Sequence, residues 1–162
     1  MIEQTLVLLK PDAVQRGLMG RVISRFEDAG LKIVGSKMIL INEEFGKKHY
    51  HDVAARRGER VLQSLLKFMT TGPVLALCLE GISAVENVRK LVGGTEPKSA
   101  PPGTIRGDFA HVSFEYADKQ SKAIENLIHA SGSVEEAKQE IVLWFKAEEL
   151  HSYKTAHEVH VF

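Results

Sequence analysis

The chain has 162 residues, of which 44% are hydrophobic and 26% charged, which is enough for one globular domain with a core of its own. Its 21 basic and 21 acidic side chains cancel, so the net charge does not favour nucleic acid or an anionic membrane as the main partner. The single cysteine, Cys78, excludes an intrachain disulfide, and no apolar run is long enough to span a membrane. We therefore expect a single domain over residues 1–162 that works in the cytoplasm.

The first third of the chain alternates between short apolar runs and helical spacing. Residues 4–9 are an apolar run closed by Lys-Pro-Asp, which predicts a buried strand followed by a turn. Apolar residues then recur at spacings of three and four over residues 18–29, which predicts a helix ended by a glycine. A second strand is predicted over residues 31–41, and Asn42 can cap a helix that runs to about Ala54.

The middle of the chain continues this pattern up to residue 94. A helix is predicted over residues 61–69 and a third strand over residues 74–80. Ser83 and Glu86 form a capping-box pattern for the next helix, which ends before two glycines. No sustained period follows over residues 94–122, and an irregular segment of that length inside a compact domain is typically functional or mobile.

The C-terminal part begins with a fourth predicted strand over residues 125–131. Ser133 and Glu136 form a second capping-box pattern, and the following residues 134–145 carry one apolar stripe at helical spacing. Residues 146–162 are predicted to be a polar tail.

The order of these elements is βαβ, a helical insertion, and then βαβα. Two βαβ halves with helices on one face indicate an α+β fold, the ferredoxin-like split βαβ sandwich with an antiparallel four-stranded sheet.

The sequence contains no glycine-rich phosphate loop, so any phosphate site must be built from side chains. Lys10 directly follows the first strand, where a cation could project from the sheet edge. Arg89 lies beside the apolar stripe of its helix, and Thr95 and Arg106 lie among the prolines and glycines of the irregular segment. Each of these residues alone is typical of an ordinary surface, but their combination with a histidine at a strand end favours an anion site.

That histidine is His129, which interrupts the apolar run of the fourth strand just before three small residues. A satisfied core histidine is one interpretation, and a nucleophile that a large anion approaches closely is the other. Glu140 lies at the edge of the apolar stripe of the last helix, from where it could face His129. A carboxylate bonded to one imidazole nitrogen fixes the tautomer and leaves the other nitrogen basic.

Three segments together resemble the nucleoside diphosphate kinase family. They are LVLLKPDAVQRG at residues 6–17, PGTIRGDF at residues 102–109 and NLIHASGSVEEAKQEIVLWF at residues 126–145. The resemblance extends from Thr5 to about Tyr153 and so covers nearly the whole chain. It implies the same ferredoxin-like fold.

The resemblance implies transfer of the γ-phosphoryl group of a nucleoside triphosphate, usually ATP, to a nucleoside diphosphate. The mechanism would be ping-pong, with His129 as the phosphohistidine that carries the group between the two nucleotides. Glu140, helped by Ser131, would orient His129, and Tyr50 would lie near the histidine and the phosphates.

The same resemblance implies how the nucleotide is held. Lys10 and Arg106 would neutralise charge on the transferred phosphoryl group and its neighbour. Arg89 and Thr95 would hold the distal part of the diphosphate, and Asn126 would contact the region of the ribose 3′-hydroxyl. Mg²⁺ would bridge the phosphates with few or no protein ligands, so no metal-binding side chains are expected. Family members are homo-oligomers, and we expect a hexamer rather than a tetramer.

The sequence departs from the family pattern at several places. Gly132 stands where the family commonly has an aspartate, and Val61 aligns with a phenylalanine that lies against the nucleobase. Residues 113–124 are an expected insertion that brings Phe114 and Tyr116. We hypothesise that one of these two aromatic side chains replaces part of the lost stacking surface. A solvated surface excursion is the alternative.

Two other functions stay open at this point. Gly132 and Val61 would fit a catalytically inactive nucleotide-binding or regulatory homologue. An RNA-binding module of the same fold is less suited, because its sheet face would need aromatic residues where the predicted strands have leucine, valine and isoleucine.

Overall fold

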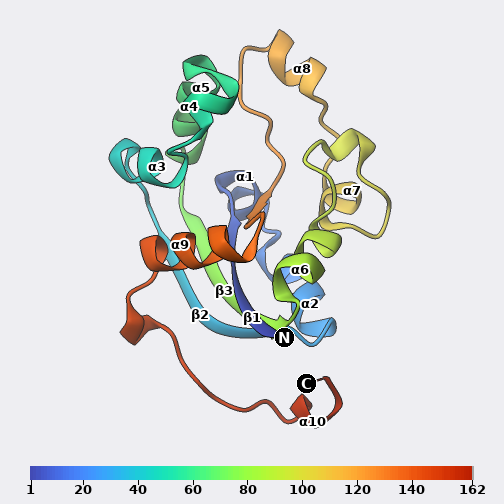
Figure 1. The fold of residues 1–162 in the computed structure, drawn as a ribbon. Coiled ribbons are helices and arrows are strands. Elements are labelled where there is room, and N and C mark those ends of the chain that lie inside the picture. Colours follow the sequence, from blue (N-terminus) through green and yellow to red (C-terminus); the bar gives the residue numbers. More distant parts are fainter. Residues whose placement is uncertain (162) are drawn as a thin grey trace.

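Four strands form one antiparallel sheet in the order β2-β3-β1-β4 in the computed structural model, which describes residues 1–161 (Figure 1). The strands are β1 (Ile2–Leu9), β2 (Lys32–Ile39), β3 (Val74–Ile82) and β4 (Ile128–Ala130). The predicted α+β, ferredoxin-like sandwich with four antiparallel strands is confirmed. The predicted domain also included Phe162, which lies outside the described residues.

The helical elements connect these strands and follow one another along the chain. They are α1 (Pro11–Gln15), α2 (Met19–Asp28), α3 (Glu43–His49), α4 (Val53–Arg57), α5 (Glu59–Met69), α6 (Ala84–Val92), η1 (Pro97–Ser99), α7 (Ile105–Phe109), α8 (Phe114–Lys119), α9 (Val134–Trp144), η2 (Ala147–Glu149) and α10 (Glu158–Val161). Among residues 1–161, none of these helices has both the length and the apolar character needed to cross a membrane.

Helices cover both faces of the sheet, whereas the sequence predicted them on one face. Leu6 and Leu8 of β1 pack into a core with α3, α5 and α9, and Val7 and Leu9 pack into a second core with α2 and α6. Successive side chains of a strand point to opposite faces, so β1 contributes to both cores. The prediction of one face was wrong, although a continuous apolar run such as that of β1 is typical of a strand buried on both sides.

The helix predicted from Asn42 to Ala54 is two helices, α3 and α4. Asn42 caps α3 as predicted, because its Oδ1 accepts a hydrogen bond of 2.8 Å from the backbone N–H of Phe45. The helix then ends at His49, and a turn places Tyr50 in the core with 8% of its surface exposed. A second break, at Gly58 with φ of 90°, separates α4 from α5. Glycine adopts such a positive φ at little cost.

Of the two predicted capping boxes, the second is half correct and the first is wrong. Ser133 accepts a hydrogen bond of 3.1 Å from the backbone N–H of Glu136, as predicted. The carboxylate of Glu136 accepts from the N–H of Gly132, one residue before the position that a capping box requires. Ser83 has φ of 46° and its side chain caps nothing, because an N-cap residue needs an extended backbone to present its hydroxyl.

The irregular segment over residues 94–122 contains η1, α7 and α8. Gly107 makes its close packing possible, because a Cβ at this position would lie 2.1 Å from the carbonyl oxygen of Pro101. Ser113 caps α8 by accepting a hydrogen bond of 3.2 Å from the N–H of Tyr116. Figure 1 shows α8 at the end of the molecule where α4 and α5 also lie.

The predicted polar tail packs against the edge strand β2. The backbone N–H of His151 donates to the carbonyl of Val34 at 2.7 Å, and the hydroxyl of Tyr153 donates to the carbonyl of Ile33 at 2.6 Å. The chain then returns below the sheet to α10, near the N-terminus (Figure 1).

Candidate active site

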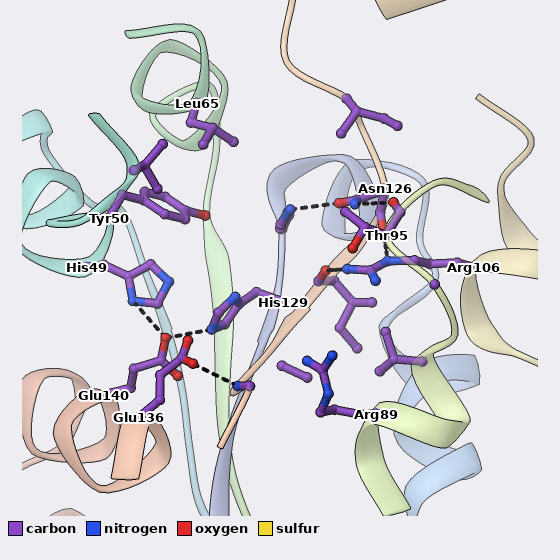
Figure 2. A pocket seen from close by; sticks show the side chains of 18 of the residues that line it. His49, Tyr50, Leu65, Arg89, Thr95, Arg106, Asn126, His129, Glu136 and Glu140 are labelled. Atoms are coloured by element: carbon purple, nitrogen blue, oxygen red, sulfur yellow. Dashed lines mark hydrogen bonds and ion pairs between the residues drawn. The ribbon is translucent and has the colours of Figure 1, made fainter. Parts of the chain in front are cut away.

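His129 lies in β4, opposite Leu8 of β1, and its side chain lines a cavity of about 540 Å³ (Figure 2). Its Nε2 is 2.7 Å from Oε1 of Glu140. A carboxylate only accepts hydrogen bonds, so Nε2 carries the proton and Nδ1 keeps a lone pair. Burial, with the nearby charges of Lys10 and Arg106, lowers the pKa of His129 to about 3. The imidazole is therefore neutral near pH 7.

Glu140, in α9, is held between the sheet and the imidazole. Its Oε2 accepts a hydrogen bond of 2.5 Å from the hydroxyl of Ser131, whose oxygen accepts from the backbone N–H of Leu6 at 3.2 Å. Only 7% of Glu140 is exposed, and this burial raises the pKa of its carboxyl group, while the neighbouring His49 and the Ser131 hydroxyl act in the opposite direction. A continuous series of hydrogen bonds thus fixes His129 relative to β1.

His49 is a neighbour of this pair that the sequence did not single out. The indole N–H of Trp144 donates to its Nδ1 at 3.2 Å, and since an indole only donates, the proton of His49 is on Nε2. The ring lies 4.7 Å from that of His129, at an interplanar angle of 85°. Burial lowers the pKa of His49 to about 3, so this ring is neutral as well. Its spacing of four from Phe45, on the buried side of α3, is the only sequence signal that could have found it.

Lys10 directly follows β1 and is 6% exposed. Its Nζ donates to Oδ1 of Asn126 at 2.7 Å, and the amide of Asn126 donates to the carbonyl of Thr95 at the same distance. Burial lowers the pKa of Lys10 to about 8, with a further lowering by Arg106 and an opposing contribution from Asp12. An ammonium group that has lost most of its water interacts strongly with an incoming anion.

Arg106, in α7, is 8% exposed and donates only to backbone carbonyls. Its three nitrogens each donate one hydrogen bond, to the carbonyls of Gly93 at 3.0 Å, Asn126 at 3.2 Å and Ile128 at 2.6 Å. These contacts hold the guanidinium in place, and no carboxylate within residues 1–161 is bonded to it. Burial and the charge of Arg89 lower the pKa of Arg106 to about 10.

Tyr50 points its hydroxyl group into the same cavity (Figure 2). The hydroxyl is buried and has no hydrogen-bond partner among residues 1–161. Burial raises the pKa of this phenol, so it keeps its proton and can act as a donor. Arg89, from α6, lies on the opposite wall and is exposed to solvent.

The cavity of about 540 Å³ brings together most of the predicted site residues. These are Lys10, Tyr50, Arg89, Thr95, Arg106, Asn126, His129 and Glu140. Val61 is not among them, because it lines a neighbouring cavity of about 390 Å³. Leu65, one turn further along α5, lines both cavities and was not singled out by the sequence.

The amino-acid sequence of the chain is similar to those of known proteins. A family model for nucleoside diphosphate kinase matches residues 3–150. The nucleoside diphosphate kinase of Borreliella burgdorferi is 48% identical over 95% of this chain and 93% of its own length. That of Pyrococcus horikoshii is 53% identical over 95% of this chain and 92% of its own length. The chain belongs to the nucleoside diphosphate kinase family.

Solved structures of nucleoside diphosphate kinases have the same fold. A transition state mimic of the Borrelia burgdorferi enzyme with bound vanadate and ADP has a TM-score of 0.96 at 47% identity, over 99% of this chain and 96% of that one. The Halobacterium salinarum enzyme in complex with CDP has a TM-score of 0.87 at 37% identity, over 100% and 99%. The expected family and enzyme class are therefore confirmed, and the chain is a phosphotransferase that acts on nucleotides.

Within residues 1–161, the only group of side chains close enough together to hold a metal ion is His49, His129 and Glu140. Magnesium prefers oxygen ligands, and two imidazoles with one carboxylate are more typical of zinc. Nε2 of His129 is already bonded to Glu140, and Nδ1 of His49 already accepts from Trp144, whereas the buried Nε2 of His49 has no hydrogen-bond partner within residues 1–161.

Proposed function

We propose that this nucleoside diphosphate kinase works by a ping-pong mechanism in which His129 carries the phosphoryl group. The observation that supports this most directly is the orientation of the imidazole. Its Nε2 is bonded to Glu140 at 2.7 Å, and its Nδ1 keeps a lone pair and makes no hydrogen bond within residues 1–161. A neutral imidazole with one nitrogen fixed and the other free is suited to nucleophilic attack.

In the first half-reaction, Nδ1 attacks the γ-phosphorus of a nucleoside triphosphate. The bond between phosphorus and the bridging oxygen breaks, and the nucleoside diphosphate leaves. Because Nε2 keeps its proton, the phosphorylated ring gains positive charge, which the adjacent carboxylate of Glu140 stabilises. A second nucleoside diphosphate then enters the same site and its terminal oxygen takes the phosphoryl group from Nδ1.

The cationic side chains would hold the phosphates during both steps. Lys10 and Arg106 would neutralise charge on the transferred group and its neighbour, since both are buried and neither is bonded to a carboxylate within residues 1–161. Arg89 and Thr95 would hold the distal diphosphate. Asn126, already bonded to Lys10, would contact the region of the ribose 3′-hydroxyl.

The hydroxyl of Tyr50 would donate to a phosphate oxygen, which would supply the partner that it lacks. The nucleotide would bring Mg²⁺ on its own phosphates, where the ion neutralises further charge. We also propose that the enzyme is a cytoplasmic homo-oligomer, a hexamer rather than a tetramer. Family membership supports this state, and the native mass by light scattering tests it.

The first test is intact mass after a brief incubation with Mg·ATP and no acceptor. The parent should gain one phosphoryl group, His129→Ala should gain none, and added GDP should discharge the adduct. A well-folded parent that binds ADP but forms no adduct would instead identify an inactive nucleotide-binding homologue.

A further inference from the structure

The backbone is strained directly before β4. Leu127 has φ of 71°, although it is not a glycine, and the backbone N–H of Ile128 donates to the carbonyl of Asn126 at 2.8 Å. A hydrogen bond from residue i+2 back to residue i, across a residue with positive φ, forms the rare type of γ-turn. A backbone of this kind persists only where the surrounding structure holds it. The turn lies between two residues of the candidate site, Asn126 and His129.

The segment of residues 10–12, which follows β1, holds this turn from both sides. The backbone N–H of Lys10 donates to the carbonyl of Leu127 at 2.8 Å. The carboxylate of Asp12, in α1, accepts from the backbone N–H of Leu127 at 2.9 Å. The side chain of Leu127 is also fully buried in the core, so the turn has little freedom to relax.

The groups that would bind phosphate depend on the same turn. Nζ of Lys10 donates to Oδ1 of Asn126 at 2.7 Å. The guanidinium of Arg106 donates to the carbonyls of the two residues that flank the strained position, Asn126 at 3.2 Å and Ile128 at 2.6 Å. A different backbone conformation at Leu127 would move both carbonyls, and the guanidinium with them.

We propose that Asp12 is a positioning residue for phosphoryl transfer. Its carboxylate holds the γ-turn at Leu127, and this turn places Asn126 and Arg106 for the phosphates. Asp12 is not among the residues that line the cavity with His129, so it acts through these neighbours and not on the substrate. The inference rests on the proposed function, in which these neighbours hold the nucleotide.

The negative charge of Asp12 also acts on Lys10. Burial and the charge of Arg106 lower the pKa of Lys10 to about 8, and Asp12 opposes both effects. His49 and His129 lie near Lys10 as well, but both imidazoles are neutral near pH 7. Asp12 is therefore the side chain that favours the charged form of this ammonium group.

The surroundings of Asp12 favour its own charged form in part. Burial raises the pKa of its carboxyl group, while Lys10 and neighbouring backbone N–H groups lower it and Glu125 raises it. Its Oδ1 is buried and has no hydrogen-bond partner within residues 1–161. The carboxylate of Asp12 and the ammonium of Lys10 thus support the charged form of one another.

The test separates the charge of Asp12 from its hydrogen bond. Asp12→Asn removes the charge but leaves an amide oxygen that can accept from Leu127, whereas Asp12→Ala removes both. Glu149→Gln is the matched control, because the carboxylate of Glu149 also accepts from a backbone N–H, that of Lys146 at 2.8 Å, and does not line the cavity. For each protein, kcat/KM is measured from neutral to alkaline pH, together with the midpoint of urea unfolding.

The loss of kcat/KM at alkaline pH, the alkaline limb, reports deprotonation of Lys10. In Asp12→Asn this limb should move to a pH below the parental value of about 8, because Arg106 still repels the ammonium and the opposing charge is gone. At lower pH this variant should keep most of the parental kcat/KM, since its amide oxygen still holds the turn. Asp12→Ala should lose on the order of 100-fold at every pH if the phosphate-binding groups move by about 1 Å. Glu149→Gln should match the parent.

An alkaline limb of Asp12→Asn at the parental pH would overturn the proposal, and so would parental kcat/KM in Asp12→Ala. A purely structural role would lower the urea midpoint of both variants without moving the limb, which also contradicts it. The pH profile of Asp12→Asn decides even where Asp12→Ala does not fold. Lys10→Arg is measured in parallel, and a limb that persists in it contradicts the role of Lys10 in the proposed function. The difference between Asp12→Ala and Asp12→Asn then still decides whether Asp12 holds the turn.

Discussion

Glu140→Gln isolates the charge that faces His129. In the parent, Nε2 of His129 is 2.7 Å from the carboxylate of Glu140. Glutamine keeps the shape of this side chain and can still accept a hydrogen bond from Nε2. It cannot, however, stabilise a positively charged phosphohistidine by ionic attraction. A hydrogen bond to a charged group is worth about 1.5–3 kcal/mol. If the full amount is lost in the transition state, the rate of phosphorylation falls about 10- to 150-fold.

The assay is single-turnover phosphorylation by Mg·ATP, followed by rapid quench and intact mass. ADP affinity, measured by calorimetry, should not change, because Glu140 lies on the far side of His129 from the proposed phosphate groups. Ser131→Ala is the matched control, since it removes the hydroxyl bonded to Glu140 at 2.5 Å but leaves the carboxylate charged. Its loss should be only about fivefold, because the Ser131 hydroxyl stabilises the same carboxylate before and during phosphorylation, so most of this hydrogen bond cancels between the two states. A parental rate for Glu140→Gln, or an equal loss in Ser131→Ala, would refute the reasoning.

Three further predictions concern charge and backbone geometry. Because burial lowers the pKa of Lys10 to about 8, kcat/KM should fall as the pH rises through 8 and Lys10 loses its charge. In Lys10→Arg this alkaline limb should disappear, and a limb that persists would assign it to another group. Gly107→Ala should destabilise the fold by about 3 kcal/mol or more in urea unfolding, because its Cβ would lie 2.1 Å from the Pro101 carbonyl oxygen. Ser133→Ala should cost about 1 kcal/mol in the same assay through loss of the α9 cap, and an unchanged midpoint would contradict this role.

Local signals predicted the elements well where a single segment determines its own structure. The apolar run of β1 and the caps at Asn42 and Ser133 all depend on residues a few positions apart. At the break after His49, Tyr50 packs into a core built from distant segments, and the backbone N–H of Ser83, where the backbone is left-handed, donates to the carbonyl of Met1. The helix propensity of a residue does not depend on such long-range packing, so these two features could not be predicted from the local sequence.

The site shows the same division. Pairing of β1 with β4 brings Lys10 and His129 to one cavity across more than a hundred residues, and no periodicity reports such a pairing. Only the combination of motifs pointed to it. His49 went unnoticed because its role depends on Trp144, which the fold brings to it from α9. Val61 aligned with the base contact, but helical geometry directs Leu65 towards both cavities.

Because of the positive charges beside His129, binding of a phosphate-containing substrate should raise the melting temperature of the protein. Burial lowers the pKa of Lys10 and Arg106, and their mutual repulsion adds to the effect on Lys10, so the charged forms of these side chains cost the empty fold free energy. A bound polyphosphate compensates the repulsion and stabilises the fold through its affinity for the native state alone. Thermal unfolding is thus a sensitive report of ligand binding, and inorganic polyphosphates that carry no nucleoside should also raise the melting temperature.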